Sequence, residues 1–169
     1  MNSIKTIILS LILFTAVIGA LIWFNGENNE SKTATINNED IGVILTANEA
    51  NYDFGSVGIK NGLVTHKYIL ENTSGKMVKI GDVSTSCMCT SAKLEIGGKT
   101  YGPFGMPGHG GGLTKAGVFV NAGEKVVVEA TFDPAAHGPA GIGEVLREIY
   151  IDTGADKPII LGFKVNIIP

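Results

Sequence analysis

The chain has 169 residues, of which 44% are hydrophobic, 17% are charged and 7% are aromatic. Its 13 Lys and Arg against 16 Asp and Glu give a formal net charge of −3, which argues against a nucleic-acid partner because phosphate binding needs a basic face. The length suits one ordinary domain, and the high hydrophobic content with few charges excludes a wholly disordered chain.

The first predicted element is an apolar stretch over residues 7–24 that contains no charged residue. At about 1.5 Å rise per residue, a helix of this length just crosses a hydrocarbon core of roughly 30 Å. Lys5 precedes the stretch, and Glu27 and Glu30 follow it, so the positive-inside rule places the N-terminus in the cytoplasm. We therefore predict a cytoplasmic stub and single-pass transmembrane anchor over residues 1–25, with the remaining chain outside the cell membrane.

A cleaved signal peptide is the alternative interpretation of this segment. Its apolar region would be shorter, roughly 7–15 residues, and would end in a cleavage site of small residues. Gly19 and Ala20 are instead followed at once by Leu21, Ile22 and Trp23, which favours the uncleaved anchor. Both interpretations export the rest of the chain, in which the polar residues 26–40 are predicted to be a flexible linker.

From residue 41 onward the apolar residues recur with a period of two, which is typical of β-strands. The clearest runs cover residues 126–132 and 159–167, and shorter runs cover residues 64–70 and 149–151. Turn sequences such as Asn61-Gly62 and Ala122-Gly123 separate the runs. Short strands without intervening helices indicate an all-β fold, so residues 41–169 are predicted to form an Ig-like antiparallel β-sandwich.

Residues 97–117 interrupt this pattern because glycine dominates their sequence. Glycine loses much conformational entropy on ordering and offers no side chain to pack, so a core strand is not expected here. We predict a long Gly-rich loop over these residues. Loops of this length without their own secondary structure are usually functional or disordered.

Five segments, taken in order, carry a family resemblance: Asp53-Phe54-Gly55, Glu71-Asn72-Thr73-Ser74-Gly75, Ser86-Cys87-Met88-Cys89-Thr90, Ala122-Gly123-Glu124 and Phe132-Asp133-Pro134. Over about residues 51–165 the chain resembles the bacterial family of domain of unknown function 1573 (DUF1573), which is related to Ig-like modules of the ASH and major-sperm-protein type. The resemblance implies an exported sandwich of seven or eight strands with no established catalytic activity. The chain departs from the family pattern at Met88, where Gly is usual, and in its longer glycine-rich insertion.

Cys87 and Cys89 are the two cysteines of the chain, and three interpretations of them stay open. They are structural residues, reduced or bridged, at a strand end; or they form a thiol-redox site; or they bind a soft metal. In an extended strand, residues i and i+2 lie about 6.6–6.8 Å apart, the upper limit for the Cα atoms of a disulfide. A bridge formed in that conformation would be strained and easily reduced.

The predicted metal site combines Cys87 and Cys89 with Met106 and His109 of the Gly-rich loop. Two thiolates, a thioether and an imidazole suit Cu(I) better than Zn(II), because thioether is a poor zinc ligand. The sequence predicts no resident cofactor, and copper is the one alternative that it suggests.

The remaining histidines do not indicate a catalytic site. His66 shares an apolar face with Tyr68 and is predicted to be structural, while His137 is predicted to lie in an exposed, solvated turn. No nucleophile elbow, P-loop or His-Glu-x-x-His motif occurs, so an enzyme is not expected. We expect a non-catalytic module that is anchored in the membrane by its N-terminal helix and binds another envelope protein. The alternatives are a soft-metal-binding protein and a thiol-redox protein.

Overall fold

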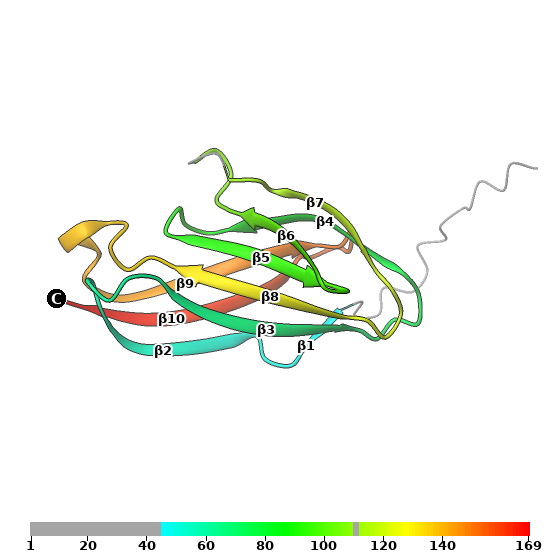
Figure 1. Cartoon of the computed structure of the whole chain (residues 1–169), viewed down its shortest axis with the longest axis horizontal. Helices are drawn as coiled ribbons and strands as arrows, with labels where there is room; N and C mark the ends of the chain where they lie inside the picture. The colour runs from blue at the N-terminus through cyan, green and yellow to red at the C-terminus, as the bar shows by residue number, and fades with distance from the viewer. Residues whose placement is uncertain (1–44, 110–111) are drawn as a thin grey trace, which may run out of the picture. The chain divides into compact units, whose positions relative to one another are not determined.

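The computed structural model describes residues 45–109 and 112–169, which form ten strands and one short 3-10 helix, η1 (Gly138–Gly141) (Figure 1). The all-β prediction is therefore confirmed. The predicted anchor over residues 1–25, the predicted linker over residues 26–40 and residues 41–44 lie outside the described residues. In the part of the chain that the structure describes, we find no helix with the length and apolarity needed to span a bilayer.

The strands form two five-stranded sheets that enclose one core. In spatial order, sheet A consists of β1 (Leu45–Ala47), β3 (Val64–Asn72), β8 (Lys125–Phe132), β5 (Thr90–Ile96) and β6 (Lys99–Phe104). In the same order, sheet B consists of β2 (Asn51–Gly58), β10 (Ile159–Ile168), β9 (Gly143–Asp152), β4 (Val78–Thr85) and β7 (Lys115–Val120). The family resemblance implies seven or eight strands, and the additional ones include short strands at sheet edges, such as β1.

The period-two alternation of the sequence predicts the inner faces of the long strands correctly. Val126, Val128 and Ala130 of β8 are completely buried. Alternate positions of β3, β9 and β10 are buried in the same way: Tyr68, Leu70, Ile149, Ile151, Leu161, Phe163, Val165 and Ile167. Burial of one such large apolar side chain contributes about 1.5–3 kcal/mol, so these rows are the main source of the stability of the sandwich.

One buried hydroxyl joins the two sheets directly. Tyr68 of β3 donates a hydrogen bond of 2.6 Å to the carbonyl oxygen of Gly162 on β10. Beside it, the ring of His66 stacks on Tyr52 at a centroid distance of 3.6 Å, and its Nε2 lies 2.8 Å from Glu49 Oε1. His66 is half-buried among these partners, which is the arrangement of a structural histidine.

One strand pair differs from the antiparallel sandwich that the sequence predicts. β2 pairs with the C-terminal strand β10 in parallel, with Asn51 opposite Gly162 and Gly58 opposite Ile168. The chain crosses from sheet A to sheet B between β1 and β2. β2 then lies beside β10 and runs in the same direction. Alternation reveals which residues face the core but not which distant strand lies alongside, and the parallel pair could not be foreseen.

The predicted Gly-rich loop over residues 97–117 is wrong at both of its ends. β6 occupies residues 99–104 and pairs with β5 through a hairpin at Gly97 and Gly98, both of which have positive φ. β7 begins at residue 115. Buried Phe104 anchors β6, and the ladder with β5 compensates for the low strand propensity of glycine.

Candidate functional site

The two cysteines lie in the connection between β4 and β5, at the same end of the sandwich as η1 (Figure 1). The connection is a tight turn, in which the Thr90 N–H donates to the carbonyl oxygen of Cys87 at 3.1 Å. The hydroxyl of buried Thr85 lies 3.0 Å from the Cys87 carbonyl oxygen and 3.1 Å from that of Thr90. These bonds replace the ladder contacts that the chain loses where it leaves β4.

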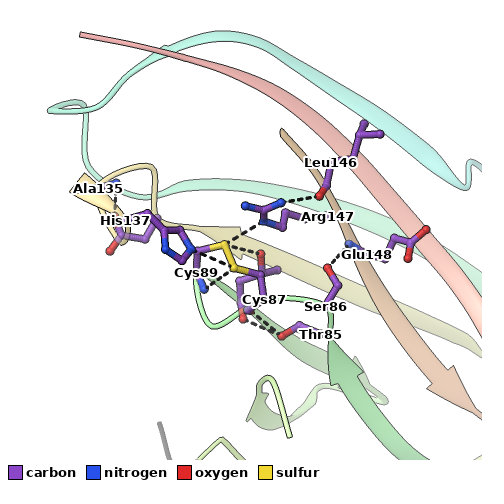
Figure 2. Close-up of a disulfide and its surroundings, with 11 residues drawn as sticks. Thr85, Ser86, Cys87, Cys89, Ala135, His137, Leu146, Arg147 and Glu148 are labelled. Carbon is purple, nitrogen blue, oxygen red and sulfur yellow. Dashed lines mark hydrogen bonds between the residues drawn. A yellow bond between two sulfur atoms is a disulfide. The ribbon is translucent and has the colours of Figure 1, made fainter. Parts of the chain in front are cut away.

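Cys87 and Cys89 form a disulfide, with their Cα atoms 5.2 Å apart (Figure 2). The separation of about 6.6–6.8 Å that is predicted for an extended strand is wrong, because the segment turns at Met88. The shorter separation lies well inside the range of ordinary disulfides. Cys87 is half-buried, whereas Cys89 is only 3% exposed, so solvent molecules reach the Cys87 sulfur more easily.

Backbone hydrogen bonds attach the turn to both sheets. The Asp133 N–H, just after β8, donates to the Cys89 carbonyl oxygen at 2.9 Å. On the other side, the Ser86 N–H donates to the Glu148 carbonyl oxygen, and the Glu148 N–H donates to Ser86 Oγ, each at 2.9 Å. The disulfide is thus held in place from sheet A and from sheet B.

Arg147 places a cation beside the buried sulfur. It occupies the same face of β9 as Ile149 and Ile151, so its side chain runs inward between the sheets at the end of the core. Its Nε donates to Cys89 Sγ at 3.1 Å and its Nη1 donates to the Leu146 carbonyl oxygen at 2.7 Å (Figure 2). Partial burial lowers the pKa of the Arg147 guanidinium, which nevertheless stays protonated at any physiological pH.

His137 approaches the other sulfur. The residue precedes η1 in the β8–β9 connection, and its Nε2 lies 3.2 Å from Cys87 Sγ (Figure 2). Asp133 orders this connection, because its Oδ1 accepts a hydrogen bond of 2.8 Å from the Ala135 N–H. His137 is exposed, as predicted for a solvated turn. Its contact with the Cys87 sulfur was not predicted. No signal in the sequence relates residues 50 positions apart.

The three side chains form a compact group of potential metal donors. The sulfur atoms of Cys87 and Cys89 and a ring nitrogen of His137 all lie within 4.8 Å of one another. Within the described residues, His109 does not belong to this group. In the Gly-rich loop, the backbone N–H of His109 donates a hydrogen bond of 3.3 Å to the Met106 carbonyl oxygen. Met106 and His109 stay predictions as ligands.

A second surface feature lies on the outer face of sheet B. A depression of about 320 Å³ opens over Gly162 of β10, where the absence of a side chain leaves the floor low. Leu146 at its rim is 67% exposed, and Glu148 is the residue directly opposite Gly162. The depression is lined by Asn51, Tyr52, Asp53, Leu146, Arg147, Glu148, Gly162, Phe163 and Lys164.

Solved structures show the same fold at low sequence identity. A protein of unknown function from Porphyromonas gingivalis W83 aligns with a TM-score of 0.52 and 10% identity over 73% of this chain and 46% of its own. A family 123 glycoside hydrolase from Clostridium perfringens aligns with a TM-score of 0.50 and 8% identity over 72% of this chain and 23% of its own. The chain thus spans less than half the length of either protein.

A third similar structure is the ASH / PapD-like domain of human CEP192, with a TM-score of 0.42 and 11% identity over 74% of this chain and 85% of that domain. No curated protein matches the sequence. The matched family segment covers residues 45–98, which include the Asp53-Phe54-Gly55 motif and both cysteines but not His137 or Arg147. The family resemblance is therefore confirmed over these residues, which match the family described as protein of unknown function (DUF1573).

Proposed function

We propose that this chain is a non-catalytic Ig-like module outside the cell membrane, anchored by its N-terminal segment. The uncharged stretch over residues 7–24, with Lys5 before it and Glu27 after it, supports the anchor and its orientation. The disulfide between Cys87 and Cys89 supports export, because such bonds persist in oxidising compartments.

A protease-protection experiment tests the location. In spheroplasts, added protease should degrade the domain while a cytoplasmic marker protein stays intact, and an alkaline carbonate wash should leave the chain in the membrane pellet. Protection of the domain would contradict export. Release by the wash would contradict anchoring, and N-terminal sequencing of the mature protein would then reveal cleavage of a signal peptide.

The proposed activity is the binding of another envelope protein at the depression over Gly162. The main support for this proposal is Leu146, a large apolar side chain that is 67% exposed at the rim of the depression of about 320 Å³. Protein interfaces commonly combine an apolar centre with a polar rim, and Asp53, Glu148 and Lys164 supply that rim here. We therefore infer a partner that inserts an apolar side chain into the hollow.

Site-specific cross-linking tests this surface. A photo-reactive aromatic amino acid at position 146 should yield a discrete cross-linked species in intact cells. The same amino acid at Thr65, which is exposed on sheet A, is the matched control and should yield none. Gly162→Ala, whose methyl group would lie 2.6 Å from Asn51 Oδ1 and narrow the hollow, should weaken the cross-link several-fold. Equal cross-linking from both positions would contradict the assignment.

Thiol–disulfide exchange is a second candidate function, favoured by the 3.1 Å contact from Arg147 Nε to Cys89 Sγ. A thiolate of an external dithiol would attack the more accessible Cys87 sulfur, and the electron pair of the S–S bond would pass to Cys89 Sγ, which leaves as a thiolate beside the guanidinium. The second thiol of the reductant would then form a disulfide with the first and release Cys87. The products are a protein dithiol, after two proton transfers, and an oxidised reductant.

The rate of reduction by dithiothreitol tests this candidate. Without the guanidinium the leaving thiolate loses its neighbouring cation, so Arg147→Gln should slow reduction about tenfold, which corresponds to about 1.4 kcal/mol in the barrier. Arg147→Lys keeps the charge and should recover part of the rate. An unchanged rate in Arg147→Gln would exclude the role, provided that the variant unfolds at the same denaturant concentration as the parent chain.

A further inference from the structure

Cys87, Cys89 and His137 form a group of metal donors that lies outside the binding surface over Gly162. We propose that, when the disulfide is reduced, these three side chains bind one Cu(I) ion through two thiolates and one imidazole. The inference is independent of the proposed interaction function, because none of the three donors lines the depression, although Arg147 lines the depression and also contacts Cys89 Sγ. It replaces the donors Met106 and His109 of the sequence analysis with His137.

The size of the group fits a single ion. Bonds of about 2.0 Å to nitrogen and 2.3 Å to sulfur place the donors of one metal roughly 3.5–4 Å from each other. The three donor atoms already lie within 4.8 Å of one another, and His137 Nε2 lies 3.2 Å from Cys87 Sγ. Reduction lets the sulfur atoms separate, so adjustments of about an ångström would complete the site.

The fold holds the donors in this arrangement without a metal. The carbonyl oxygen of Cys89 is bound by the Asp133 N–H, and the same Asp133 orders the connection that carries His137. One residue thus couples the thiol turn to the imidazole. Such pre-organisation reduces the ordering entropy that metal binding would otherwise require.

The number of donors and the local charge favour Cu(I) over Zn(II). In the described part of the chain, the group contains three His, Cys or carboxylate donors, so Zn(II) would need a fourth ligand such as water to reach its usual tetrahedral geometry. Two thiolates and Cu(I) carry a net charge of −1, and the Arg147 guanidinium beside Cys89 neutralises it. With Zn(II) the same ligands are already neutral, and the guanidinium would leave an excess positive charge.

Formation of the site follows a balanced sequence. A dithiol reductant transfers two electrons and two protons to the disulfide and becomes a disulfide itself, which leaves two thiols on the protein. Cu(I) then displaces both thiol protons and binds the thiolates and the neutral imidazole. The oxidised protein, which has no thiolates, should not bind the ion at this position.

A competition titration tests the proposal. The full chain is reduced with dithiothreitol, desalted without oxygen and checked for two free thiols, and Cu(I) is then titrated against a chromogenic chelator. We expect one Cu(I) per reduced chain and none per oxidised chain. Cys87→Ser and Cys89→Ser should each lower the affinity at least about 100-fold, and His137→Ala about 10–100-fold. Binding that is equal in the oxidised and reduced chains would overturn the proposal.

Three further measurements test the ligand set and the choice of metal. His109→Ala and Met106→Leu are matched controls and should leave the affinity within about twofold, whereas a larger loss in them than in His137→Ala would overturn the assignment of His137. X-ray absorption of the copper-loaded parent chain should show two sulfur neighbours and one nitrogen neighbour. A coordination shell without nitrogen would also overturn the assignment of His137. Tighter binding of Zn(II) than of Cu(I) would overturn the choice of metal.

Discussion

The two ends of the sandwich treat their polar groups in opposite ways. Asn72, at the end of β3, is only 1% exposed, and its Nδ2 lies within 3.0 Å of the carbonyl oxygens of Lys76, Val120 and Asn121. Its Oδ1 accepts hydrogen bonds from the backbone and the hydroxyl of Ser74. One buried amide thus joins the β3–β4 connection to the end of β7 and the β7–β8 connection, and it has no unused hydrogen-bonding capacity.

At the opposite end, Arg147 and His137 approach sulfur atoms, which are weak hydrogen-bond acceptors. Oxygen acceptors would hold these side chains more firmly, so the contacts add little to the stability of the fold. The comparison separates a structural polar centre from a reactive one. It predicts that substitutions at Asn72 change stability, whereas substitutions near the disulfide change the chemistry of the thiols.

The largest loss of stability is expected for Asn72→Ala. It leaves buried carbonyl oxygens without donors, and each such group costs about 1–3 kcal/mol, so the free energy of unfolding should fall by about 3 kcal/mol. Urea denaturation measures the change. Asn121→Ala is the control, because its exposed amide donates to Glu124 alone, and it should cost less than about 0.5 kcal/mol. A loss below 1 kcal/mol in Asn72→Ala would contradict the structural role of the Asn72 amide.

Tyr68→Phe should have the next largest effect, about 1–2 kcal/mol, because the carbonyl oxygen of Gly162 loses its donor. Burial raises the pKa of Tyr68 well above its ordinary value of about 10. The stabilisation from the neutral phenol is therefore fully present below about pH 10 and is lost as the pH rises from there toward the folded-state pKa. The parent chain should lose stability more steeply above pH 10 than Tyr68→Phe does, and equal slopes would contradict this origin.

Arg147→Met should cost about 1 kcal/mol or less. The guanidinium loses two hydrogen bonds, but its partial burial is unfavourable, and an apolar side chain of similar length removes that penalty. Denaturation and the rate of disulfide reduction should be measured on the same sample. We expect the rate of disulfide reduction to change while the denaturation midpoint stays nearly constant. The reverse result would show that Arg147 acts mainly on stability.

His137→Ala should have the smallest effect on stability, within about 0.5 kcal/mol, because the side chain is exposed and its partner is a sulfur atom. The midpoint of urea denaturation in the disulfide form is the measurement. A destabilisation comparable to that of Asn72→Ala would show that His137 is a structural residue and that the two ends of the sandwich do not differ as described.

The sequence contains most of the information about the layers of the fold. Alternation at Val126 and Val128, or at Leu161 and Phe163, reports directly which side chains leave water, because burial and a period of two are the same physical fact in a strand. The β5–β6 hairpin was missed for the opposite reason. Its ladder depends on the partner strand, and local glycine content hides it.

The candidate site was only half predictable. Cys87 and Cys89 are evident as a pair, because they are the two cysteines of the chain and stand two positions apart. Their partners come from the β8–β9 connection, which meets the cysteines because β8 ends beside Thr90, and from β9, which meets them because it pairs with β4. Proximity of that kind depends on strand order. His109 is suggested by its position along the chain and stays a prediction, whereas the contact between His137 and Cys87 depends on how the sandwich folds and leaves no trace in the sequence.

β1 is a short strand, so the ladder that holds it to the sheet offers little resistance to a pulling force. Three residue pairs, from Leu45 opposite Asn72 to Ala47 opposite Leu70, hold this strand to β3. Under a pull applied through the chain ahead of Leu45, β1 would detach before β2, because six residue pairs hold β2 to β10. Detachment of β1 would release three residues of extended chain, about 10 Å, while the pairs between β2 and β10 stay in place.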